Sequence, residues 1–131
     1  MSTQITSQFN IDNWDEKPYS EAENGPALTR ASVHKTFTGG IKGKSTLEYL
    51  MIMHDDDFAQ FVGLEQITGE VNGRTGSFVL RQEGTYEEGT ARADCRIVDN
   101  SGTGELEGIS GSGTMVATHE QATLTLTCQF E

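Results

Sequence analysis

The chain is poor in cysteine, in apolar residues and, beyond its middle, in positive charge. Two of its 131 residues are cysteine, and the hydrophobic fraction of 34% is low for a soluble domain. No lysine follows Lys44, neither lysine nor arginine follows Arg96, and the net charge is −11. Because nucleic acids and anionic membranes bind through basic patches, we expect neither as a partner. The excess of carboxylates indicates a solubilising surface rather than a cation-binding face.

Long apolar runs are also missing. The longest apolar cluster, Tyr49–Met53, is far too short to span a bilayer as a helix. Met1–Gln8 contains neither a basic segment nor an apolar stretch, so we expect no signal peptide and a cytoplasmic location. In that compartment the cysteines are expected to be free thiols. The length predicts a single domain over residues 1–131.

Glycine, by contrast, is abundant, with 15 residues, and it frames a pentad that occurs three times. Gly39–Gly43, Gly69–Gly73 and Gly104–Gly108 each place Ile, Val or Leu midway between two glycines. Glycine permits positive φ and close approach of neighbouring strands. The repeat therefore predicts a recurring β corner with one inward apolar side chain, as in a closed or nearly closed antiparallel barrel.

Alternation of apolar and polar residues, clearest in Ala91–Ile97 and Ala122–Phe130, is typical of half-buried antiparallel strands. The other strand candidates are Gln8–Asp15, Leu28–Phe37, Ser45–His54, Phe58–Glu70, Arg74–Gly84 and Thr103–Leu106, the last resuming at Thr114–Thr118. Asn72-Gly73 is a strong hairpin signal, and Asp55–Gln60 is alternatively one helical turn. The predicted fold class is all-β, an eight-stranded antiparallel β-barrel of closed, lipocalin-like type with little helix.

The two cysteines lie on the apolar faces of their strands. In a meander, one strand would separate Cys95 from Cys128, placing them roughly 10 Å apart. A disulfide requires Cα atoms within about 7 Å, so the sequence predicts two buried, inert thiols.

The middle strands are apolar on both faces, unlike the terminal ones. Leu47–Met53 is almost wholly apolar. In the next strand candidate, Phe61 falls on one face and Val62 and Leu64 fall on the other. A strand with one face exposed to solvent normally carries polar residues on that face. Since no spare helix is available as a cover, we expect the outer face to form a homo-oligomer contact.

Motifs that specify a chemistry are incomplete. Gly40–Ser45 ends like a phosphate-binding loop, but Thr38 stands where that loop needs its first glycine. Gly108–Ser112 lacks the final glycine of a nucleophile elbow. His54–Asp57 is the one metal-like cluster and has too few ligands for a calcium loop. We therefore expect neither a metal nor a cofactor.

Charged residues inside strand candidates are better site candidates. Glu48 and Glu65 both lie among apolar neighbours, and a carboxylate that points into a barrel is either paired with a cation or has a raised pKa. Such groups are candidates for acid–base chemistry. An outward charge, or a plugging pair with an arginine, is the structural alternative, and strand parity does not decide which of the two carboxylates faces inward.

Two segments, Gly69–Leu80 and Ser101–Gly108, closely resemble a bacterial domain-of-unknown-function family, number 3224. Phe9–Trp14 and Arg30–Gly39 are also similar, so the resemblance covers essentially the whole chain. It implies a β-barrel similar to allene oxide cyclase and no established activity. Members of the family often carry His near the position of Gln82, and its absence here weakens a catalytic role at that position.

The leading functional hypothesis is a barrel that binds a small molecule in an apolar cavity. The candidate ligand-binding residues are Tyr49, Met51, Phe61, Phe78 and Leu80 for an apolar lining, and Glu65, Arg74 and Gln82 for polar contacts. A second hypothesis, suggested by the resemblance, is an isomerase or cyclase that confines a lipid-like substrate, with Glu48 or Glu65 as the catalytic group. A third is a filled barrel for oligomerisation, with Glu65 and Arg74 as a buried structural pair.

Overall fold

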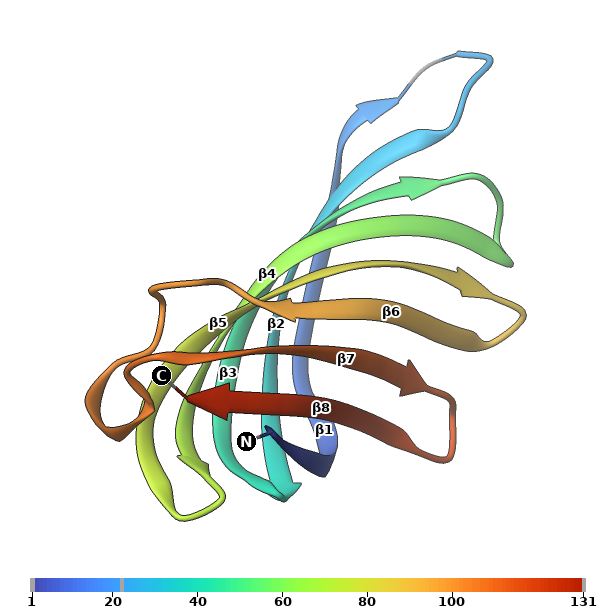
Figure 1. The fold of residues 1–131 in the computed structure, drawn as a ribbon. Coiled ribbons are helices and arrows are strands. Elements are labelled where there is room, and N and C mark those ends of the chain that lie inside the picture. The colour runs from blue at the N-terminus through green and yellow to red at the C-terminus, as the bar shows by residue number, and fades with distance from the viewer. Residues whose placement is uncertain (1, 22, 131) are drawn as a thin grey trace.

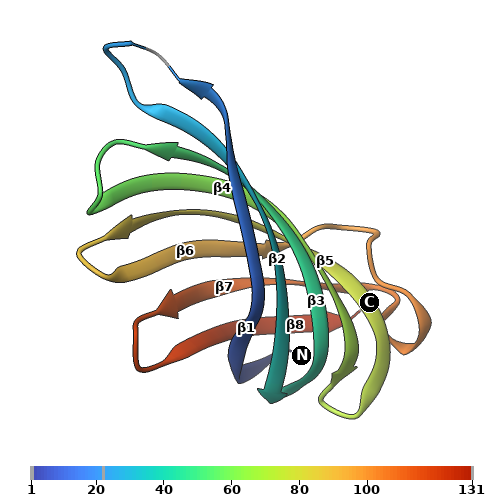
Figure 2. The same cartoon turned by 180° about the vertical axis from the view of Figure 1, so that it is seen from behind.

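Eight strands form one antiparallel sheet that closes in a ring (Figures 1 and 2). The computed structural model describes residues 2–21 and 23–130. The elements in chain order are β1 (Ser2–Glu21), β2 (Ala27–Gly39), β3 (Ile41–Met53), β4 (Phe58–Val71), β5 (Arg74–Glu87), β6 (Thr90–Ile97), η1 (Gly104–Leu106), β7 (Ile109–Ala117) and β8 (Ala122–Phe130). Each strand pairs with the next, and β8 pairs with β1. The prediction of an all-β fold with eight antiparallel strands is confirmed.

The ring closes only along the first part of β1. Residues Ser2–Gln8 pair with β8, whereas the remainder of β1 pairs with β2 alone and extends away from the ring as a hairpin (Figure 1). This free edge carries Pro18 together with several carboxylates. Both features discourage edge-to-edge association, because proline removes a backbone donor and like charges repel. Strands β1, β3, β5 and β7 all terminate at the same end of the ring, which we call the open end. The opposite end is called the closed end.

The glycine pentads form the closed end. Their central residues, Ile41, Val71 and Leu106, are all buried, and Ile41 is the register partner of Val71. Gly43 and Gly69 face each other across β3 and β4, where a Cβ on Gly43 would lie 2.2 Å from the backbone oxygen of Thr68. The predicted corner with an inward apolar side chain is therefore confirmed, and close strand approach explains these two glycines.

One local prediction is wrong, and one alternative is excluded. Thr103–Leu106 is not a strand, because Gly104–Leu106 forms a 3₁₀ turn in which only Leu106 is buried. One buried residue in a glycine-rich segment does not distinguish a strand from a turn. Asp55–Gln60 forms no helical turn, since the Asp55 carboxylate accepts the backbone N–H of Asp57 in a bend and β4 begins at Phe58.

Cys95 on β6 and Cys128 on β8 are free and buried, with β7 between them. The prediction of two unpaired, buried thiols is confirmed. Within residues 2–21 and 23–130, no helix has the length and apolar character needed to cross a membrane.

The Asn72-Gly73 turn offers a test of the β4–β5 hairpin. Both residues have positive φ, 50° at Asn72 and 87° at Gly73, as a two-residue turn that matches strand twist requires. We expect Gly73→Val to lower the free energy of unfolding by about 1–3 kcal/mol, because a β-branched residue is strained there. Gly73→Asn is the control and should cost less, since Asn tolerates this conformation. Chemical denaturation measures the free energy of unfolding of the wild type and both variants. Equal stability of Gly73→Val and the wild type would contradict the predicted backbone strain at this turn.

Candidate functional site

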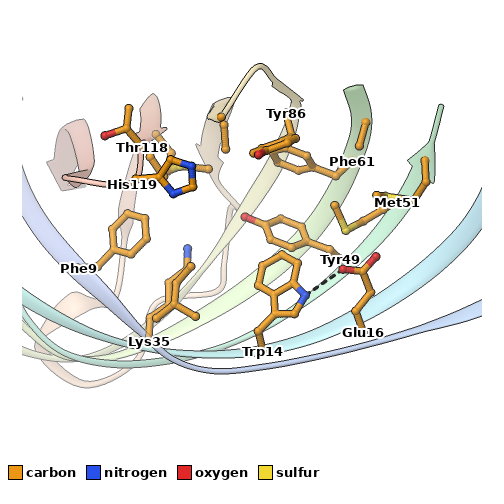
Figure 3. A pocket seen from close by; sticks show the side chains of 17 residues that line it. Phe9, Trp14, Glu16, Lys35, Tyr49, Met51, Phe61, Tyr86, Thr118 and His119 are labelled. Carbon is orange, nitrogen blue, oxygen red and sulfur yellow. Dashed lines mark hydrogen bonds between the residues drawn. The ribbon is translucent and has the colours of Figure 1, made fainter. Parts of the chain in front are cut away.

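A cavity of about 350 Å³ lies at the open end of the ring (Figure 3). Its walls are mainly apolar and aromatic, and they come from β1 to β7 and the turn that follows β7. The lining residues include Trp14, Tyr49, Met51, Phe61, Tyr86 and Met115. Below the cavity, towards the closed end, the interior is filled by fully buried apolar side chains. The hollow is therefore confined to one end.

A bulge in β1 determines which of its residues face the cavity. Ile11 is the register partner of Lys35 on β2, and Asn13 is the register partner of His34. Asp12 is therefore an extra residue in β1. Because side chains alternate along a strand, an extra residue moves the inward positions from odd to even numbers. Ile11 and Trp14 consequently both line the cavity. The bulge brings the only tryptophan of the chain into its wall.

A glycine makes room for the central aromatic residue. Gly63 on β4 is the register partner of Tyr49 on β3. A Cβ on Gly63 would lie 2.6 Å from Cδ1 of Tyr49, so the tyrosine ring lies over a position without a side chain. Phe61 packs edge-on against the same ring, with centroids 4.8 Å apart. This packing holds the phenol at the base of the cavity.

A buried polar network lies directly beneath the aromatic wall. Glu65 accepts hydrogen bonds from Ser45 Oγ at 2.6 Å and from Gln82 Nε2, and the Nζ atom of Lys35 is 3.5 Å from its Oε2. Gln82 in turn accepts the Tyr49 hydroxyl at 2.8 Å. Every partner of Glu65 is a donor, which suits an ionised carboxylate. Lys35 and Glu65 are 3% and 0% exposed, so the pair is a buried salt bridge.

The network also affects neighbouring acidic groups. Burial, followed by the charge of Glu65, raises the pKa of Tyr49 well above its usual 10.0. The Tyr49 hydroxyl therefore remains a donor across the physiological range. Lys35 lies 4.1 Å from the centroid of the Phe9 ring and lines the cavity, so its ammonium group contacts both an aromatic face and the hollow (Figure 3).

A second polar contact lies at the mouth. Glu16 on β1 accepts hydrogen bonds from Trp14 Nε1 at 2.9 Å and from Thr29 Oγ1 at 2.8 Å. Thr118 and His119, in the turn before β8, face it across the opening (Figure 3). The mouth thus lies between the free part of β1 and the β7–β8 turn.

The residues predicted for ligand binding separate into three groups. Tyr49, Met51 and Phe61 line the cavity. Glu65 and Gln82 lie just below it, linked to Tyr49.

The third group lies away from the cavity. Phe78 and Leu80 are buried in the filled interior. Arg74 begins β5 at the closed end, where its guanidinium stacks 3.9 Å from the centroid of the Phe130 ring. The predicted Glu65–Arg74 pair is wrong, since Lys35 is the partner of Glu65.

Of the two candidate catalytic carboxylates, only Glu65 points inward. Glu48 lies on the outer face and pairs with Arg30 at 2.9 Å. A hydrogen bond from Ser32 and, to a smaller extent, the Arg30 guanidinium lower the pKa of this partly exposed carboxyl. Glu48 is therefore remote from the cavity.

Sequence reasoning missed Lys35, Trp14 and Glu16. A signal for Lys35 was available, because it occupies the inward position between Val33 and Phe37 in an otherwise alternating strand. No such signal existed for Trp14 and Glu16, since their orientation depends on the bulge. Across residues 2–21 and 23–130, no group of three or more His, Cys, Asp and Glu side chains is placed to hold a metal ion.

Comparison with known proteins identifies relatives without an assigned activity. Residues 5–129 match the model of a family described as "Protein of unknown function (DUF3224)". A crystal structure of a DUF3224 protein with unknown function from Shewanella oneidensis MR-1 is similar, with 30% sequence identity and a TM-score of 0.86. The similarity covers 100% of this chain and 99% of that one. No curated protein sequence matches the chain.

The burial of Cys95 beside Glu65 predicts slow thiol chemistry. Burial, and to a lesser extent the Glu65 charge, raises the pKa of Cys95 from 9.0 to about 12, and burial raises that of Cys128 to about 11. At pH 8 the higher pKa alone reduces the Cys95 thiolate about a thousandfold. We therefore expect iodoacetamide to label the native protein far more slowly than the protein in guanidinium chloride. Mass spectrometry follows both reactions, and rapid labelling of native protein would show that these thiols are accessible.

Proposed function

We propose that this chain, which belongs to the DUF3224 family of proteins of unknown function, is a β-barrel that binds a small apolar molecule at its open end. The observation that carries the proposal is the cavity of about 350 Å³, which has an aromatic wall and a buried polar network at its base. Binding sites for small molecules combine a largely apolar lining with a few fixed polar groups.

The size and position of the cavity also support binding. Eight-stranded barrels have room for filling side chains or for one small ligand. Here Phe78, Leu80 and Leu126 fill the interior below the cavity, while the hollow at the open end falls within the usual range for ligand sites, roughly 300–1,000 Å³. A ligand can enter between β1 and the β7–β8 turn without separating paired strands.

Filling the cavity provides a direct test with a matched control. Ala117 on β7 faces the cavity, whereas the neighbouring Val116 points to the other side of the sheet. We expect the neutral fluorescent probe N-phenyl-1-naphthylamine to bind the wild type and to bind Ala117→Phe about tenfold more weakly or worse. Val116→Phe should bind as the wild type does. Energy transfer from Trp14, the only tryptophan, reports the binding.

Three outcomes are informative. Loss of binding in Ala117→Phe alone supports the cavity, and equal loss in both variants points to a general packing defect. A wild-type protein that binds no neutral probe argues against the proposed function.

A second candidate function, self-association, is supported by the outer face of β3 and β4. Leu50 and Val62 are register partners. The exposed fractions are 50% for Leu50, 45% for Val62 and 56% for Leu64. Charges of both signs border this apolar strip, Glu48 beside Leu64 on one side and Arg81 on the other. A two-fold interface must be self-complementary, and a strip bordered by both signs meets that requirement. We propose a second copy of the chain as its occupant.

Leu64→Glu tests this interface. We expect it to raise the dissociation constant of a wild-type dimer about thirtyfold or more, because a central apolar contact is replaced by a charge. Thr127→Glu, on the exposed side of β8, introduces the same charge elsewhere and should leave association unchanged. Light scattering coupled to size exclusion measures the mass. A monomeric wild type at high concentration would contradict the interface.

The isomerase or cyclase hypothesis receives less support. Glu65 is the only one of the two candidate carboxylates near the cavity, and donors already engage both of its oxygens. A general base must reach the proton that it removes. The similarity to allene oxide cyclase and the cytoplasmic location remain predictions.

A further inference from the structure

We propose that the cavity selects an uncharged amphiphile whose oxygen atom accepts a hydrogen bond from Lys35, and that it excludes the corresponding fatty carboxylate. This inference rests on the proposed function, because it specifies what the same cavity binds. It comes from the charge balance at the base of the cavity and from the donors left available there.

The charge of Lys35 is already compensated. Its Nζ lies 3.5 Å from Glu65 Oε2, and both side chains are almost completely buried. A ligand carboxylate beside Lys35 would therefore place two negative charges against one positive charge in a site shielded from water. Burial of an uncompensated charge is strongly unfavourable. A lysine without Glu65 would instead favour a carboxylate.

The other titratable groups around the cavity do not reverse this balance. Glu16 lies at the mouth, held by Trp14 and Thr29, and adds a further negative charge. Glu65 lies below the base, and the raised pKa of Tyr49 keeps its phenol neutral. His119 lies on the rim and is exposed. The net charge of the whole chain, −11, also opposes an anionic ligand.

The available donor is the ammonium group of Lys35. An ammonium carries three N–H donors, and Glu65 is its one ion-pair partner in the described part of the chain. The Tyr49 hydroxyl, in contrast, already donates a hydrogen bond to Gln82. Lys35 lines the cavity and its charged end points into it (Figure 3). An alcohol, ketone or ester oxygen satisfies this donor without adding charge, while an apolar tail contacts the aromatic wall.

A matched set of eight-carbon probes tests the selection. Calorimetry at pH 8 measures the binding of 1-octanol, 2-octanone and sodium octanoate to the wild type. We expect either neutral probe to bind about tenfold more tightly than octanoate, or better. Octanoate binding equal to or tighter than both neutral probes would overturn the inference while leaving the proposed function intact. Failure of all three to bind would overturn the proposed function and the inference with it.

Glu65→Gln should reverse the preference. The amide keeps the size of the side chain and can still bond with Ser45 and Gln82, because a serine hydroxyl also accepts. Lys35 then lacks a counter-charge, so we expect octanoate to bind at least about tenfold more tightly than to wild type and to raise the melting temperature of the variant. Unchanged octanoate affinity in a folded Glu65→Gln protein would overturn the inference.

The double variant Lys35→Met with Glu65→Gln is the control for this reversal. It removes both charges, so the base of the cavity is neutral and no unpaired charge destabilises the fold. We expect it to lose the gain in octanoate affinity and to bind 1-octanol more weakly than wild type, because the donor is gone. Tight octanoate binding by the double variant would show that Lys35 does not recognise the head group.

Discussion

The buried salt bridge between Lys35 and Glu65 is the constraint on which the rest of the interior depends. Its partners come from β2, β3, β4 and β5, and the network joins these four strands inside the ring. Removing one member of such a pair typically costs about 3–5 kcal/mol, because the other charge is left buried and unpaired. A slip of one residue between β3 and β4 would turn Glu65 outward. The network therefore ties strand register to charge compensation.

The two ends of the ring differ because glycine is used differently in each. At the closed end, paired glycines let strands approach closely while Ile41, Val71 and Leu106 fill the interior. At the open end, Gly63 leaves space for the Tyr49 ring, and the bulge in β1 turns Trp14 inward. One end is thus packed like an ordinary core and the other retains a hollow with an aromatic wall.

The same strands that hold the buried network carry the exposed apolar strip. Along β4, Phe61 and Glu65 face the interior, while Val62 and Leu64 face outward. The proposed ligand site and the proposed interface between copies are two faces of one layer.

Alternation and glycine spacing determined seven of the eight strands, the corner residues and the buried thiols, because these features depend on neighbours close in the sequence. They misplaced the start of β7, because the glycine-rich segment before it forms a 3₁₀ turn. The inward candidates Tyr49, Met51 and Phe61 could be predicted for the same reason. Only the tertiary structure decided three features of the site. It turned Glu65 inward and Glu48 outward, and it paired Glu65 with Lys35 rather than Arg74. It also brought Trp14 into the cavity wall. Each depends on strand register or on a bulge, and a shift of one residue reverses the direction of a side chain.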